Sequence, residues 1–199
     1  MKPIFIKEFL PKQILNLCHS YSLLKFSNKK TFQTADNQSN VLLFEYGDLL
    51  METLMDASTP VVEQNVGKKL WPTYSYLRIY DKGSDLKIHK DRESCEYTVA
   101  LCLGCDPIDK PYEIFVGEVD KSSDYKYFDE DEVYQRYRID YKFPMLPNNA
   151  LIFKGMDKIH WREICTHDHF ITVFLHYVDQ EGQYKDYKFD KRNILGAVK

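Results

Sequence analysis

The sequence DLKIHKDRESCEYTVALCLG, residues 85–104, contains a histidine and a carboxylate two positions apart, just before a long apolar run. Side chains alternate between the two faces of a strand, so His89 and Asp91 lie on the same face if this segment is extended. The run from Val99 to Leu103 is typical of a buried strand. A neutral imidazole and a carboxylate on one face can bind one divalent metal ion, but a third ligand must come from another part of the chain.

Short β-type runs continue on both sides of this stretch. From Trp71 onward the chain contains YSYLRIY, LKIHKD, EYTVALCLG, YEIFVGE, NALIFKG and HFITVFLHYV, separated by turn residues. A polar segment around residues 120–137 could contain one short helix, but no other helix-length segment separates these strands. Strands without intervening helices pair antiparallel, so the sequence predicts a sandwich or a jelly roll. The aromatic content of 15% agrees with a β-rich fold.

The residues before Trp71 predict mainly helices. PKQILNLCHSYSLLKF, residues 11–26, predicts a helix with Ile14, Leu15, Cys18, Tyr21 and Leu24 on one face. GDLLMETLMDA, residues 47–57, predicts a second helix. Thr59-Pro60 resembles an N-cap and first-turn pair that opens a third helix, which ends near Gly67.

These patterns predict a single domain over residues 1–199. A mainly helical support (1–70), which includes a polar loop at 27–40, precedes a jelly-roll catalytic core (71–180). The C-terminal tail (181–199) contains interspersed basic and aromatic residues and is predicted to be solvated.

Composition and charge exclude several classes of protein. The net charge of −3 disfavours a nucleic-acid partner, and no apolar run is long enough to span a membrane. The first residues lack the apolar core of a signal peptide, and the five cysteines are an odd number. We therefore expect a soluble, cytoplasmic protein with free thiols, in which Cys102 and Cys105 are buried and bind no zinc. The oligomeric state is left open.

A second histidine outside the opening stretch has a context that suits a metal ligand. LPNNALIFKGMDKIHW reads as a turn, a buried strand, a polar loop and then His160, about 70 residues beyond Asp91. Two histidines and one carboxylate form the facial triad of non-heme Fe(II) oxygenases, which leaves three coordination positions open. Those positions can hold a bidentate keto acid and O2.

The pair His89-x-Asp91, the distal His160 and the strand pattern resemble the Fe(II)/2-oxoglutarate-dependent dioxygenases, and most of all their prolyl-4-hydroxylase-like branch. The resemblance covers roughly residues 71–180. In that branch a tyrosine about nine positions before the first metal histidine, across a Gly-containing turn, contacts 2-oxoglutarate. RIYDKGSDLKIH has Tyr80 at this position. The resemblance implies a double-stranded β-helix (jelly-roll) core.

The resemblance also implies a reaction. Such a hydroxylase uses Fe(II), 2-oxoglutarate and O2, and releases succinate and CO2, with His89, Asp91 and His160 as catalytic metal ligands. The expected substrate is a peptidyl residue, an amino acid or another small metabolite. Activity should fall in acid, because His89 and His160 must be neutral to bind the metal.

One feature of the family is missing. An Arg or Lys about ten residues after the distal histidine, on the last core strand, usually pairs with the C5 carboxylate of 2-oxoglutarate, and the corresponding run here has neither. Arg162, two residues beyond His160, is the best substitute, because a guanidinium can bind a carboxylate bidentately. Arg78, which shares a face with Tyr80, is the second candidate, and His176 is the third.

Three other interpretations stay open. The missing strand cation would suit a binding or structural jelly roll whose metal site is degenerate. A nucleobase-directed dioxygenase would use the same ligands, although the acidic net charge argues against it. A cupin-like metal enzyme without a keto acid would usually have more histidines.

Overall fold

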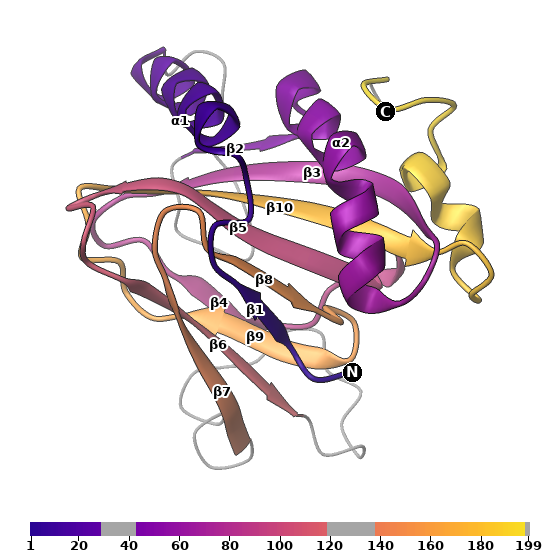
Figure 1. The fold of residues 1–199 in the computed structure, drawn as a ribbon. Coiled ribbons are helices and arrows are strands. Elements are labelled where there is room, and N and C mark those ends of the chain that lie inside the picture. Colours follow the sequence, from indigo (N-terminus) through magenta and orange to yellow (C-terminus); the bar gives the residue numbers. More distant parts are fainter. Residues whose placement is uncertain (29–42, 119–137, 198–199) are drawn as a thin grey trace.

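Two antiparallel sheets face each other in the computed structural model, which describes residues 1–28, 43–118 and 138–197 (Figure 1). One sheet contains β1 (Ile4–Ile6), β2 (Leu43–Tyr46), β3 (Leu70–Tyr80), β5 (Tyr97–Asp106), β8 (Ala150–Phe153) and β10 (His169–Asp179). The other contains β4 (Leu86–His89), β6 (Tyr112–Glu118), β7 (Arg138–Met145) and β9 (Lys158–Arg162). Their strand orders are β1-β8-β5-β10-β3-β2 and β4-β9-β6-β7. The predicted mainly β fold with N-terminal helices is confirmed.

Both faces of the six-stranded sheet are buried, which explains the apolar run at the centre of the sequence. On β5, Leu101 and Leu103 belong to the core beneath the helices, whereas Ala100 and Cys102 belong to the core between the two sheets. A strand covered on both faces reads as a continuous hydrophobic run rather than an alternating one.

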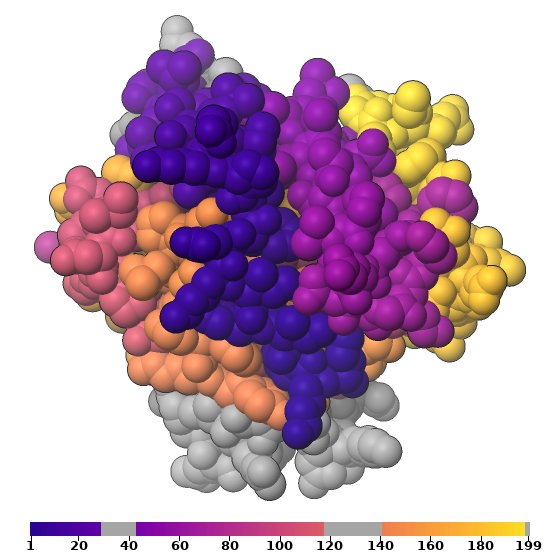
Figure 2. Space-filling view, viewed as in Figure 1, coloured from indigo at the N-terminus to yellow at the C-terminus, as the bar shows by residue number. Residues whose placement is uncertain are grey.

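The outer face of the six-stranded sheet is covered by α1 (Lys12–Ser27) and α2 (Leu49–Val66). The ribbon shows both helices on the same side of the sheet, and the space-filling view shows their atoms covering much of that side (Figures 1 and 2). The helix predicted from residue 11 onward is therefore α1. The loop predicted at 27–40 lies mostly, and the short helix at 120–137 wholly, outside the described residues.

The predicted second and third helices are one continuous helix, so their separation was wrong. Pro60 lies inside α2, and the Thr59 hydroxyl donates to the Met55 carbonyl one turn back instead of capping a new helix. The helix begins after Asp48, whose carboxylate accepts from the Met51 N–H. It ends, as predicted, at Gly67, which has a φ of 74°.

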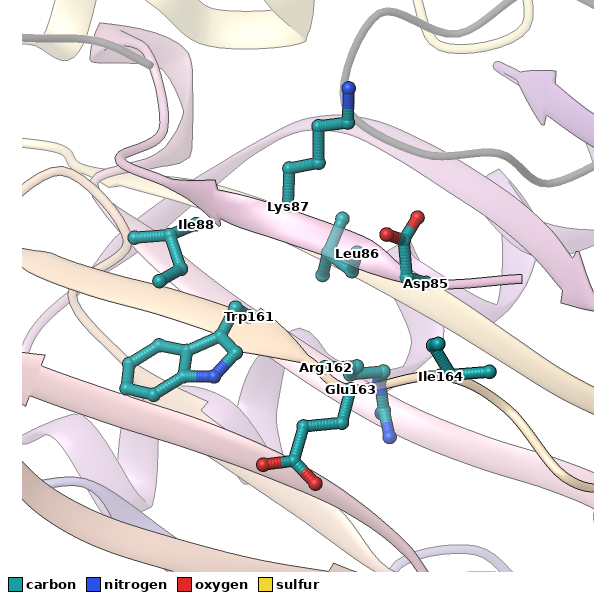
Figure 3. A pocket seen from close by; sticks show the side chains of 8 residues that line it. All are labelled: Asp85, Leu86, Lys87, Ile88, Trp161, Arg162, Glu163 and Ile164. Atoms are coloured by element: carbon teal, nitrogen blue, oxygen red, sulfur yellow. The ribbon is translucent and has the colours of Figure 1, made fainter. Parts of the chain in front are cut away.

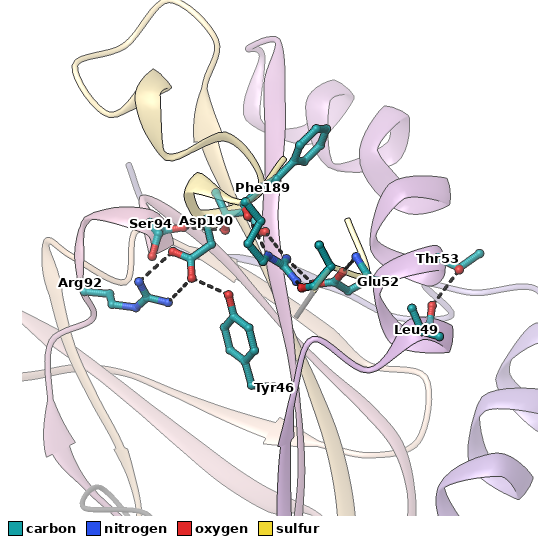
Figure 4. Close-up of polar contacts among 12 residues, drawn as sticks. Tyr46, Leu49, Glu52, Thr53, Arg92, Ser94, Phe189 and Asp190 are labelled. Carbon is teal, nitrogen blue, oxygen red and sulfur yellow. Dashed lines mark hydrogen bonds and ion pairs between the residues drawn. The ribbon is translucent and has the colours of Figure 1, made fainter. Parts of the chain in front are cut away.

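The C-terminal segment is anchored to the body of the protein by the buried residues Asp190 and Arg192, whereas the rest of residues 181–197 are partly or fully exposed, so the prediction of a solvated tail was right except at these two positions. A short helix, η3 (Lys185–Lys191), packs against β3. Asp190 is 1% exposed and accepts two hydrogen bonds of 2.8 Å from Arg92 (Figure 4). Arg192 forms a buried ion pair with Glu52 on α2. These partners are far apart in the sequence, and the local polarity of the tail does not reveal them.

Replacing Arg192 with alanine should destabilise the protein strongly, because the buried carboxylate of Glu52 would lose its cation. Breaking a buried ion pair in this way costs ~3–5 kcal/mol. The free energy of unfolding can be measured by urea denaturation. Lys69→Ala is the matched control, since it removes an exposed ion pair with Glu63 that should contribute less than ~1 kcal/mol. Equal losses in the two variants would contradict this account.

All five cysteines are free thiols, as predicted, and the predicted burial of Cys102 and Cys105 extends to the other three. In the part of the chain that the structure describes, no helix is both long enough and apolar enough to cross a membrane.

Candidate active site

Strand pairing brings together two histidines that are far apart in the sequence. β4 and β9 are antiparallel neighbours, and His89 lies directly opposite His160. The ring centroids are 4.2 Å apart, and the two side chains are 3% and 2% exposed. The His160 ring also contacts Phe153 of the opposite sheet, so the pair faces the space between the two sheets.

The hydrogen bonds of both histidines leave the same nitrogen free for a metal. Nδ1 of His89 lies 2.7 Å from the Lys87 carbonyl, and Nδ1 of His160 lies 3.2 Å from the Lys158 carbonyl. A carbonyl oxygen can only accept, so each Nδ1 carries a proton, and a neutral ring then keeps its lone pair on Nε2. Histidines that bind metals are commonly oriented in this way.

Asp91 completes the predicted triad. Its Oδ1 atom is 3.5 Å from Nε2 of both His89 and His160, and ligand atoms of the three residues all lie within 4.8 Å of one another. The Asp91 N–H donates to the Gly155 carbonyl, which ties the two loops together. A Cβ atom on Gly155 would be only 2.0 Å from Asp91 Oδ2, so the carboxylate can occupy this position only beside a glycine.

The charges of the triad suit a divalent cation. Burial alone would raise the pKa of Asp91, but the neighbouring His160 and His89 hold it well below its usual value, so the carboxylate is ionised. Burial and the proximity of His160 lower the pKa of His89, which keeps that imidazole neutral. Two imidazole nitrogens and one carboxylate oxygen are the donor set of non-heme Fe(II) sites.

Arg162 is a buried cation whose hydrogen-bonding capacity is only partly used. It lies two residues beyond His160 on β9 and is 2% exposed. Nη1 donates to the carbonyls of Tyr112 and Glu113, at 2.8 and 3.2 Å. Nε and Nη2 are buried, and no described residue accepts from them. A buried guanidinium without an anion is costly, so these two atoms indicate a place for a ligand carboxylate.

Aromatic rings surround this guanidinium. Its Cζ atom lies 5.6, 4.8 and 5.0 Å from the ring centroids of Tyr80, Tyr112 and Phe170. Tyr80 is fully buried, and its hydroxyl accepts from Arg78 at 3.3 Å. The structure thus brings Tyr80, Tyr112, Phe170 and Arg162 together beside the triad, and Arg78, which is also buried, contacts this group through the Tyr80 hydroxyl.

His176 does not offer a cation for a carboxylate. Burial lowers its pKa to about 4, so the ring is neutral near pH 7. Asp91, Cys95 and His176 also place potential ligand atoms within 4.8 Å of one another. However, Cys95 Sγ lies 3.1 Å from the Tyr74 hydroxyl, burial raises the pKa of its thiol, and the Thr98 hydroxyl contacts both Asp91 and His176. These contacts favour a hydrogen-bonded cluster over a metal site.

A pocket of about 400 Å³ opens along β4 and β9 (Figure 3). It is lined by Asp85, Leu86, Lys87, Ile88, Trp161, Arg162, Glu163 and Ile164. Arg162 is shared between this pocket and the compartment lined by the rings of Tyr80, Tyr112 and Phe170, whereas neither His89 nor His160 lines the pocket.

Sequence analysis did not identify Gly155, Thr98 or Tyr112 as parts of the site. Gly155 was treated only as a turn residue, and Thr98 only as part of a strand. Their roles depend on contacts between distant strands, for which the local sequence carries no signal.

Comparisons with known proteins give structural neighbours alone. No protein-family model matches the sequence, and no curated protein matches it. Among solved structures, the Pseudomonas putida prolyl-4-hydroxylase aligns over 89% of this chain and 92% of its own, with a TM-score of 0.59 and 10% identity.

Two further neighbours were solved with ligands. The viral collagen prolyl hydroxylase of Paramecium Bursaria Chlorella virus-1, a 2OG complex, aligns over 89% of this chain and 96% of its own (TM-score 0.56, 10% identity). The epimerase SnoN, in complex with Fe3+, alpha ketoglutarate and nogalamycin RO, aligns over 89% and 78% (TM-score 0.63, 12% identity). The fold of this chain is therefore the double-stranded β-helix of the Fe(II)/2-oxoglutarate-dependent oxygenases, and its structural neighbours include prolyl-4-hydroxylases.

Proposed function

We propose that this protein is an Fe(II)- and 2-oxoglutarate-dependent dioxygenase that hydroxylates a peptidyl residue, an amino acid or another small metabolite. The observation that carries the proposal is the combination of two features in one interior space. A buried two-histidine, one-carboxylate triad lies beside a buried guanidinium that has two unused donors.

In this proposal His89, Asp91 and His160 hold the metal. When bound, Fe(II) with 2-oxoglutarate and O2 supplies the oxidising chemistry, and the co-substrate leaves as succinate and CO2. The three residues leave three coordination positions for the keto acid and O2. A reducing, cytoplasmic compartment would suit both the ferrous ion and the free thiols.

Arg162 and Tyr80 hold the keto acid in this proposal. Nε and Nη2 of Arg162 form a fork that suits the C5 carboxylate, and the metal binds the opposite end of the molecule. The rings of Tyr80, Tyr112 and Phe170 keep water away from this ion pair and so strengthen it. The unpaired guanidinium also argues against a degenerate site, which would have no need for a buried cation.

The visible absorption spectrum of the Fe(II)-loaded protein under anaerobic conditions tests the proposal. Addition of 2-oxoglutarate should produce a weak charge-transfer band, because the keto acid chelates the iron. The Asp91→Asn variant should give no band. Bound iron without a band in the wild-type protein would favour a cupin-like enzyme or a binding protein. If the band appears, succinate formation after admission of O2 would show that the bound 2-oxoglutarate is turned over.

A further inference from the structure

The two carboxylate oxygens of Asp91 make different contacts. Oδ1 lies 3.5 Å from Nε2 of both His89 and His160, whereas Oδ2 lies 3.0 Å from the Thr98 hydroxyl. Thr98 is fully buried on β5 and lies directly opposite His176 of β10. The same hydroxyl is 3.1 Å from Nδ1 of His176. A chain of polar contacts therefore runs from the triad to a histidine on the neighbouring strand.

The Thr98 hydroxyl has only one proton, so it can donate to only one of its neighbours and must accept from the other. The Thr98 hydroxyl donates its one proton to Oδ2 of Asp91, because a carboxylate oxygen accepts. Its other potential acceptor, the Cys95 carbonyl, is neutral and lies at 3.5 Å, and the charged acceptor at 3.0 Å forms the stronger bond. The hydroxyl must then accept from His176, so the neutral imidazole carries its proton on Nδ1.

His176 is held firmly at the end of this chain. It is 5% exposed, and its ring centroid lies 4.5 Å from that of Tyr74. The Tyr74 hydroxyl in turn contacts Cys95 Sγ at 3.1 Å. Ring contacts on β3 and strand pairing with β5 thus fix the imidazole, and through it the orientation of the Thr98 hydroxyl.

We infer that Thr98 and His176 are positioning residues that hold Asp91 with Oδ2 turned toward the protein and Oδ1 toward the point shared by the two histidines. The role in metal binding rests on the proposed function, but the orientation of the carboxylate is a property of the metal-free chain. Loss of such outer contacts typically lowers metal affinity or activity about 10–100-fold.

Binding of Co(II), followed by visible absorption, tests the effect on metal affinity. Thr98→Val keeps the shape of the side chain but removes the hydroxyl, and His176→Leu removes the ring N–H. Both should bind Co(II) ~10–100-fold more weakly than the wild type. Thr98→Ser and His176→Asn keep a donor in about the same place and should bind close to wild type. Ser22→Ala, which removes a buried hydroxyl on α1, is the matched control and should not change the affinity.

The results separate this inference from the proposed function. Wild-type affinity in a folded Thr98→Val variant would overturn the inference, and so would equal losses in Thr98→Val and Thr98→Ser, because packing alone would then explain them. A wild-type protein that binds no metal would overturn the proposed function instead.

A second measurement needs neither metal nor a variant. Long-range ¹H–¹⁵N NMR of the metal-free wild type should show His176 protonated on Nδ1. Protonation on Nε2 would overturn the inference, even if the Thr98 variants fail to fold.

Discussion

Replacing Asp91 with asparagine will abolish tight Fe(II) binding while leaving the chain folded. The substitution keeps the size of the side chain and an oxygen that can accept from Thr98. It removes the carboxylate charge of the triad, so a buried divalent ion would be held only by two imidazole nitrogens, which carry no charge as metal ligands. Loss of an outer contact lowers metal affinity by up to ~100-fold. Loss of the charge of a ligand itself should cost more, so we expect the Fe(II) affinity to fall by more than ~100-fold. Isothermal titration calorimetry under anaerobic conditions measures the Fe(II) affinity.

Asp157→Asn is the matched control for this variant. Asp157 lies in the loop that precedes β9, its side chain is 61% exposed, and it pairs only loosely with Lys154, at 3.9 Å. Neutralising it should leave iron binding and the charge-transfer band unchanged. Iron binding at wild-type strength in Asp91→Asn would mean that the metal uses other ligands, and both the triad assignment and the positioning role of Thr98 would fail.

The fold could be predicted from the sequence where the signal was periodic and local. The strand-like runs after Trp71 and the amphipathic pattern of α1 gave the correct elements. Errors occurred where tertiary contacts overruled a local preference. Pro60 normally marks a helix start, but α2 continues through it because one face of the helix packs on the six-stranded sheet. Asp190 and Arg192 look solvated, but their partners, Arg92 and Glu52, are 98 and 140 positions away.

In the candidate site, too, residues with a local sequence signal could be predicted, and residues placed by tertiary contacts could not. His89 and Asp91 could be grouped from their spacing alone, because a strand has a period of two. The strand-loop context of His160 and the resemblance to a family made it a candidate ligand, but its place opposite His89 depends on the register of β4 against β9. Gly155 could not be identified at all, since the need for a glycine arises from the Asp91 carboxylate in another loop.

Replacing Arg162 with methionine should raise the KM for 2-oxoglutarate by about 140- to 3,700-fold while leaving Fe(II) affinity unchanged. The C5 carboxylate would be buried without its cation, and breaking a buried, hydrogen-bonded ion pair costs ~3–5 kcal/mol, at ~1.4 kcal/mol for each tenfold change. Methionine fills much of the same space with apolar atoms. The KM comes from succinate production, and the Kd comes from titration of the charge-transfer band.

Two further variants identify the residue that binds the C5 carboxylate of 2-oxoglutarate. Arg162→Lys keeps the charge but loses the fork, so its KM should lie between those of the wild type and Arg162→Met. Arg78→Met tests the second candidate and should change the KM far less, because the Arg78 guanidinium already donates to the Tyr80 hydroxyl. If the order is reversed, so that Arg78→Met loses the keto acid and Arg162→Met retains it, then Arg78 is the carboxylate partner. The unused donors of Arg162 would then need another ligand, such as an acidic group of the substrate.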